Sequence, residues 1–97
     1  MTAFYSLSKA GEGWQECTIN NISGRGVGLE YNALEKFDID SDIHLRIYIP
    51  EESEPVKIEG KVRWVEQGEE GFNAGIEVTT ELDTNRLEGI IQRMIEL

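Results

Sequence analysis

Hydrophobic and polar residues alternate over much of the chain, and this period of two predicts β-strands. The most regular run extends from Ile43 to Ile49, where four isoleucine or leucine positions alternate with histidine, arginine and tyrosine. Pro50 ends this run, because proline has no N–H to donate to a strand ladder. A second long run extends from Val56 to Trp64. Each run is expected to turn one apolar face toward a protein core.

Four shorter runs also have strand character and are separated by turn-forming residues. They are Thr2–Leu7, Trp14–Ile19, Val27–Tyr31 and Phe72–Val78. The first two flank a segment that contains Gly11 and Gly13, so they predict a hairpin. Short strands of even spacing that are closed by glycine turns predict a small antiparallel β-barrel, here of six strands. We expect its core to contain Ile43, Leu45, Ile47, Val62, Trp64 and Ile76.

Two segments depart from the alternating pattern. The polar stretch 32–42 is predicted to be a loop, anchored by Leu34, Phe37 and Ile39. After Leu82 the apolar spacing becomes helical, which predicts a C-terminal α-helix that docks on a face or mouth of the barrel. The docked stripe is expected to consist of Leu87, Ile90, Ile91 and Met94. Off that stripe lie Ile95 and Leu97, which we expect to stay exposed or to cover a partner, including a second copy of the chain.

The length and charge of the chain narrow its class. Its 97 residues are enough for a single domain over residues 1–97, and 39% of them are hydrophobic, as in ordinary globular proteins. The formal net charge of -10 opposes long-range attraction to nucleic acid and to anionic membranes. That charge either keeps a small protein soluble or raises the requirement for a local basic pocket if the ligand carries phosphate.

The cysteine count and the N-terminal sequence bear on the compartment. Cys17 is the only cysteine, so no internal disulfide can form, which fits a reducing compartment. The first eight residues have no basic segment followed by a long apolar run, as a signal peptide would have. No stretch approaches the roughly 18 apolar residues needed to cross a bilayer. We therefore expect a cytoplasmic protein with no membrane insertion.

The chain offers few groups for catalysis. His44 is the only histidine, and the alternation of its strand places it on the outer side. One histidine and Cys17 do not supply the ligands of a zinc site. The acidic residues are scattered, and several fall in turns. We expect no catalytic residue, no metal and no cofactor, and we expect that the protein is not an enzyme.

The stretch from Asn20 to Gly26 is rich in asparagine, serine and glycine, which predicts a tight turn between two strands. The same residues could serve a ligand. Asn21 can donate to and accept from a base edge, the Ser23 hydroxyl and exposed N–H groups can meet phosphate oxygens, and Gly26 permits a close approach. The residues alone leave both interpretations open.

Three segments resemble the PilZ domain of bacterial cyclic di-GMP signalling. The turn carries Asn21-x-Ser23-x-x-Gly26, similar to the family's [Asp/Asn]-x-Ser-x-x-Gly signature. The strand Gly60–Trp64 resembles the family's Gly-x-Val-x-Trp pattern, and Gly75–Val78 resembles its Gly-Ile-x-Phe pattern with valine in place of the aromatic residue. The resemblance covers roughly residues 3–95. It implies a PilZ-like barrel with a C-terminal helix and cyclic di-GMP as the ligand, with a half-site at Asn21, Ser23, Arg25 and Gly26.

One part of the family pattern does not appear in this chain. The resemblance implies an Arg-x-x-x-Arg motif just before the first barrel strand, whose guanidinium groups clamp phosphates and stack on guanine. No two arginines here have that spacing, and Arg25, which lies within the turn, is the nearest substitute. Either the protein lacks the motif, or this chain is a fragment that begins after it.

Two functions remain. The first is a degenerate PilZ regulatory or adaptor domain that binds the nucleotide weakly or not at all and acts through an unidentified protein partner. The alternative is a genuine cyclic di-GMP receptor domain whose arginine motif lies upstream. The outward faces of the two long strands carry Arg46, Lys57, Lys61 and Arg63. These cations either pair across strands with Glu59 and its neighbours or form a docking patch for an acidic partner.

Overall fold

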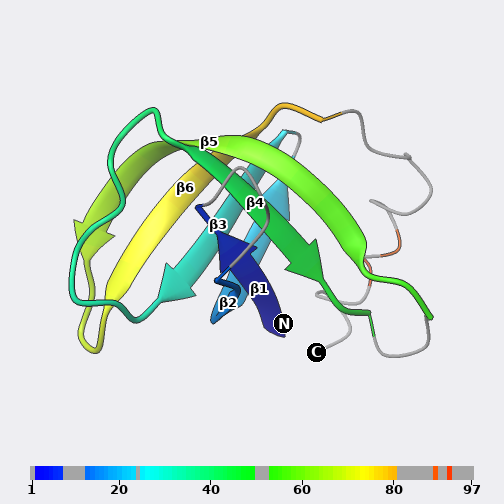
Figure 1. Ribbon diagram of the computed structural model, residues 1–97, viewed down its shortest axis with the longest axis horizontal. Helices are drawn as coiled ribbons and strands as arrows, with labels where there is room; N and C mark the ends of the chain where they lie inside the picture. The colour runs from blue at the N-terminus through cyan, green and yellow to red at the C-terminus, as the bar shows by residue number, and fades with distance from the viewer. Residues whose placement is uncertain are drawn as a thin grey trace.

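The computed structural model describes residues 2–7, 13–23, 25–49, 53–80, 89 and 92. The strands are β1 (Thr2–Ser6), β2 (Gln15–Ser23), β3 (Gly26–Tyr31), β4 (Asp42–Ile47), β5 (Val56–Gln67) and β6 (Phe72–Val78). All neighbouring strands are antiparallel, and their order is β1-β2-β3-β6-β5-β4 (Figure 1). Because β4 also pairs with β1, the sheet closes into a barrel. The predicted six-stranded antiparallel barrel is therefore confirmed.

The interior of the barrel is filled by the inward residues of all six strands. The alternation predicted for β4 is observed, since Ile43, Leu45 and Ile47 are almost completely buried. Ile58 and Val62 of β5 and Ile76 of β6 meet them in the same core. Burying one aliphatic side chain of this size stabilises a fold by about 1.5–3 kcal/mol.

Strand β2 continues through the segment that was predicted to be a turn. Asn20, Asn21, Ile22 and Ser23 belong to β2, Arg25 lies in a turn, and β3 begins at Gly26. A shift of register between Ile19 and Asn21 explains the difference. The extra residue of this β-bulge leaves Asn20 and Asn21 both exposed, and it returns Ile22 to the core. The two asparagines can therefore occupy a strand without burying their amides.

The predicted burial of Trp64 is wrong. Its side chain is 47% exposed, whereas Val62 two residues earlier is fully buried. The pairing of β5 with β6 shifts register between these two residues, so Arg63 is an extra residue and Trp64 turns outward. Val65 then packs against the core in place of Trp64.

Of the three predicted apolar anchors of the loop over residues 32–41, only Phe37 is buried. Phe37 is buried, and its ring is stacked on that of Tyr31 with 3.6 Å between the ring centroids. The backbone N–H of Phe37 also donates a 2.8 Å hydrogen bond to the Tyr31 hydroxyl. Leu34 and Ile39 are exposed, so their expected anchoring role is wrong. The stacked ring and its hydrogen bond are sufficient to fix the loop on the barrel.

The expected C-terminal helix lies outside the described residues, of which only Gly89 and Gln92 fall in that segment. The same holds for its docked stripe (Leu87, Ile90, Ile91 and Met94) and for Ile95 and Leu97. Among the described residues, no helix is long and apolar enough to cross a membrane.

Candidate functional site

A shallow groove of about 400 Å³ lies on the outer surface of the barrel, across β2, β3, β6 and β5. Three of the four predicted ligand-binding residues line it: Asn21 near the end of β2, Arg25 in the turn, and Gly26 at the start of β3. For Ser23 the structure describes the backbone, which pairs with Gly26, while its side chain lies outside the described part. The predicted motif is thus gathered at one end of the groove.

The side-chain amide of Asn21 lines the groove. It pairs with Gly28 of β3, and a Cβ atom at Gly28 would lie only 2.9 Å from both polar atoms of the Asn21 side chain. The amide can therefore lie across β3 only because residue 28 is glycine. The neighbouring Asn20 instead donates a 3.3 Å hydrogen bond to Glu30, whereas Asn21 has no hydrogen-bond partner among the described residues. Both a donor and an acceptor remain open to a ligand.

Trp64 adds an aromatic surface to the same groove, and the sequence reasoning did not place it there. Its indole lies over Gly75 of β6, where any Cβ would overlap the ring. The signal that was missed is the apolar Val65 directly after Trp64, which breaks the alternation of β5 and marks a bulge. An exposed indole beside an unpartnered amide suits the stacking and edge recognition of a planar base.

An ion-pair cluster forms one end of the groove. The Nε of Arg63 donates a 2.6 Å hydrogen bond to Oε2 of Glu77, and its Nη1 donates another of 2.6 Å to Oδ1 of Asp40. The hydrogen bond from Arg63 lowers the pKa of Glu77, and the positive charge of Arg25 contributes further in the same direction. Both carboxylates and the guanidinium remain partly open to solvent. The positive charge of Arg63 is therefore already balanced by carboxylates of the protein itself.

The cations that were predicted on the outer faces of β4 and β5 do not form one continuous patch. Lys61 pairs with Asp42 at 3.1 Å, and Arg63 pairs as described above. Arg46 instead lies over the ring of Trp14, 4.2 Å from its centroid, in a cation–π contact. Lys57 is opposite Arg46 in the strand register and has no ion pair within the described residues. The interpretation as cross-strand pairs therefore fits Lys61 and Arg63.

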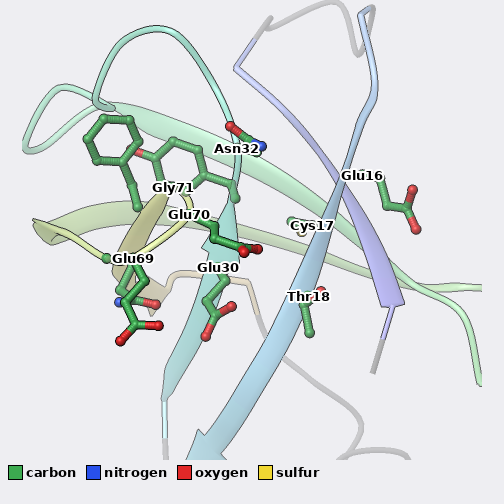
Figure 2. Close-up of a pocket in the computed structure, with 12 residues that line it drawn as sticks. Glu16, Cys17, Thr18, Glu30, Asn32, Glu69, Glu70 and Gly71 are labelled. Atoms are coloured by element: carbon green, nitrogen blue, oxygen red, sulfur yellow. The ribbon is translucent and has the colours of Figure 1, made fainter.

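A second groove, of about 720 Å³, lies between β2 and the turn that joins β5 to β6. Figure 2 shows the carboxylates of Glu30, Glu69 and Glu70 on one side of β2, with Glu16 on its other side. This groove is larger than the first, but its carboxylates repel an anionic ligand. A phosphate-bearing molecule is better matched to the smaller groove, which contains two arginines.

The described residues do not gather metal ligands, since they contain no group of three histidine, cysteine or acidic residues that could hold a metal ion. His44 is half-buried, and its Nδ1 lies 3.7 Å from Oε1 of Glu59. Cys17 borders the acidic groove, but its thiol is buried, and burial raises its pKa to about 12. The thiol is therefore protonated near neutral pH and is a poor nucleophile or metal ligand.

Comparison with known proteins gives one family and one fold. The PilZ domain family model matches residues 5–97. No curated protein sequence matches the chain. The solved structure of the Bacillus subtilis inhibitor of motility (MotI/DgrA) is similar over 98% of this chain, with a TM-score of 0.70 and 20% sequence identity. The similar region is 45% of that longer chain, so this chain spans less than half of its length. At this identity the likeness shows a shared fold.

Proposed function

This chain belongs to the PilZ domain family, and we propose that it is a cytoplasmic regulatory domain that acts through protein contacts and binds cyclic di-GMP weakly by itself. PilZ domains are regulatory binding domains of cyclic di-GMP signalling and not enzymes. The fold-related inhibitor of motility is a regulator by its name, which agrees with a regulatory role. We treat residues 1–97 as one PilZ-like domain.

The observation that carries this proposal is the composition of the groove beside the β2–β3 turn. Asn21 offers a free amide to the edge of a guanine, and Trp64 offers a face on which the base can stack. Base–aromatic stacking contributes about 1–3 kcal/mol per base. We propose that these two side chains hold one base of the dinucleotide.

The groove offers weaker contacts to the phosphates of the ligand than to its base. The groove contains two arginines, Arg25 and Arg63, which lie on different elements and do not reproduce a pair spaced by four residues. Each hydrogen bond from the turn contributes about 0.5–1.5 kcal/mol net. Immobilising a ligand costs several kcal/mol, and a chain of net charge -10 repels a dianion. We therefore expect weak binding.

The outer face of β1 and β4 is the surface that we propose for a protein partner. Phe4 and the half-exposed Tyr48 meet edge to face, with 5.6 Å between their ring centroids. Beside them Arg46 covers Trp14. Aromatic and arginine side chains are the types enriched at the centres of protein interfaces.

A second copy of the chain, held through Ile95, is another proposed partner. A strict monomer in light scattering at high concentration would exclude this partner.

The second candidate function is a genuine receptor domain whose arginine motif lies upstream of residue 1. The free amide of Asn21 and the exposed indole of Trp64 favour it, because both are open to a ligand. A longer protein that includes native upstream residues separates the two functions. Tight binding by the longer protein and weak binding by this chain support the receptor.

Isothermal titration of this chain with cyclic di-GMP tests the proposal. We expect a dissociation constant weaker than about 100 µM, equivalent to less than about 5.5 kcal/mol of binding free energy. Asn21→Ala should weaken the residual binding several-fold, because it removes the free amide. Asn32→Ala is the matched control, since that exposed amide lines the acidic groove and not this one, and it should change the affinity little. A micromolar or tighter constant contradicts weak binding, and equal effects of the two variants contradict the site.

A further inference from the structure

Glu77 lines the groove between the predicted ligand turn and Arg63. In the register of β3 with β6 it lies opposite Gly26, the glycine of the predicted ligand turn. Its carboxylate accepts a 2.6 Å hydrogen bond from Nε of Arg63. On the other side is the turn, where the carbonyl of Arg25 accepts a 2.6 Å hydrogen bond from the N–H of Val78. A carboxylate therefore occupies the position between the two arginines of the groove.

Asp40 holds the other edge of the same guanidinium. Its carboxylate accepts from Nη1 of Arg63 at 2.6 Å, and its backbone is fixed by a 2.7 Å hydrogen bond to the carbonyl of Val62. Asp40 has a φ of 67°, in the left-handed region, so the loop is shaped to bring this side chain to the β5 bulge. The Arg63 side chain is 43% exposed, and the two carboxylates use two of its five N–H donors, so a ligand can still reach it.

We propose that Glu77, assisted by Asp40, is an internal counter-anion that occupies Arg63 and thereby keeps the phosphate affinity of this groove low. A phosphate and a carboxylate use the same guanidinium donors with the same planar geometry. A phosphate that takes the Nε–H or the bonded Nη1–H must displace a carboxylate, and a phosphate at the remaining N–H groups lies beside two negative charges. This inference rests on the proposed function, because it assumes that the groove faces the dinucleotide.

A contribution to the stability of the fold does not explain the ion pairs of Arg63 with Asp40 and Glu77. Exposed ion pairs contribute little to the stability of a fold, and each of these three side chains is 43% exposed or more. The lowered pKa of Glu77 keeps its carboxylate charged at neutral pH, so the competing anion is always present. Glu77 is also the outward-facing residue between buried Ile76 and Val78, so it can be replaced without altering the core of the barrel.

Titration of three proteins with cyclic di-GMP tests the inference: the wild type, Glu77→Gln and Glu59→Gln. Glu59 is the matched control, because it is an exposed glutamate on β5 that pairs with His44 outside the groove. Both variants change the net charge by one unit. Glu77→Gln should bind about tenfold more tightly than the wild type, and Glu59→Gln should differ by less than about twofold. Asp40→Asn should give a smaller gain in affinity. Asparagine adopts the positive φ of residue 40 readily, so the substitution should not strain the loop.

Two outcomes of the titration would overturn the inference, and a third would overturn only the proposed function. Equal gains in Glu77→Gln and Glu59→Gln would mean that only net charge matters. No gain in Glu77→Gln up to about 1 mM ligand, with its thermal unfolding unchanged, would mean that Arg63 does not meet phosphate, while weak binding by the wild type would still stand. If the wild type itself binds at micromolar concentration, the proposed function fails, and the ratio between the two variants still decides this inference. The Nε–H resonance of Arg63 should shift in Glu77→Gln before ligand is added; an unchanged resonance contradicts the ion pair.

Discussion

Asn20 and Asn21 are chemically identical neighbours with different environments. Asn20 is tied to Glu30, and Asn21 lies across Gly28 with its amide open to the groove. The motif in the sequence identified Asn21, but its reason for facing outward is the bulge after Ile19. In a regular strand, two successive side chains would point to opposite faces. A one-residue change of register therefore decides whether this amide can meet a ligand.

Cys17 is the buried titratable group from which a pH dependence follows. Burial raises the pKa of its thiol from the ordinary 9.0 to about 12, and the nearby charge of Glu16 adds to the effect. An unfolded chain would lose this proton near pH 9, and the folded chain only near pH 12. The unfolded state then binds fewer protons in that window, so the free energy of unfolding falls as the pH rises above about 9.

Urea unfolding at pH 7.5, 9 and 10.5 measures this dependence. The midpoint should fall over this series in the wild type and fall less in Cys17→Ala. Part of the fall should remain in the variant, because burial also raises the pKa values of Tyr5 and Tyr31. A wild-type midpoint that stays constant up to pH 10.5 would show that the thiol is accessible to solvent in the native state.

The two bulges explain how the strands build the groove. The bulge in β2 exposes Asn21, and the bulge in β5 turns Trp64 outward over Gly75. The alternation of apolar residues was sufficient to predict the strands and the barrel, because each strand has one buried face. The alternation could not locate the bulges, because the position of the extra residue depends on how the strand pairs with its neighbour. The burial of Trp64 was wrong for this reason.

Gly75→Ala tests the packing of the β5 bulge. The new Cβ would overlap the Trp64 indole, which is exposed and can swing into solvent, so the loss of stability should be about 1 kcal/mol. In a Trp14→Phe background, the emission of Trp64 should move to longer wavelength and become easier to quench with acrylamide.

Gly60→Ala provides the contrast to this substitution. Its Cβ would meet the backbone carbonyl of Glu77, which cannot move aside, so we expect a loss nearer 3 kcal/mol. Unchanged emission of Trp64 in Gly75→Ala would contradict the described position of the indole.

The molecule as a whole presents two grooves of different charge on one barrel. The larger one carries Glu30, Glu69 and Glu70, and the smaller one balances Arg25 and Arg63 against Glu77. Composition predicted the excess of negative charge but not its distribution. The pairing of Arg63 with Asp40 and Glu77 joins residues 23 and 14 positions apart, which are brought together by the pairing of β5 with β6 and by the bond of the Asp40 backbone to β5. At physiological salt, charges act over about 8 Å, so these local pairs outweigh the net charge.

We propose that the smaller groove is the ligand surface, and amide NMR during a cyclic di-GMP titration locates the bound ligand residue by residue. This measurement detects weak binding at millimolar ligand and reports position as well as affinity. We predict progressive shifts of the Asn21 side-chain amide, the backbone amides of Gly26 and Gly28, and the indole N–H of Trp64. If the largest shifts fall instead around Glu30 and the β5–β6 turn, or if none of the four predicted groups shifts, the smaller groove is not the ligand surface.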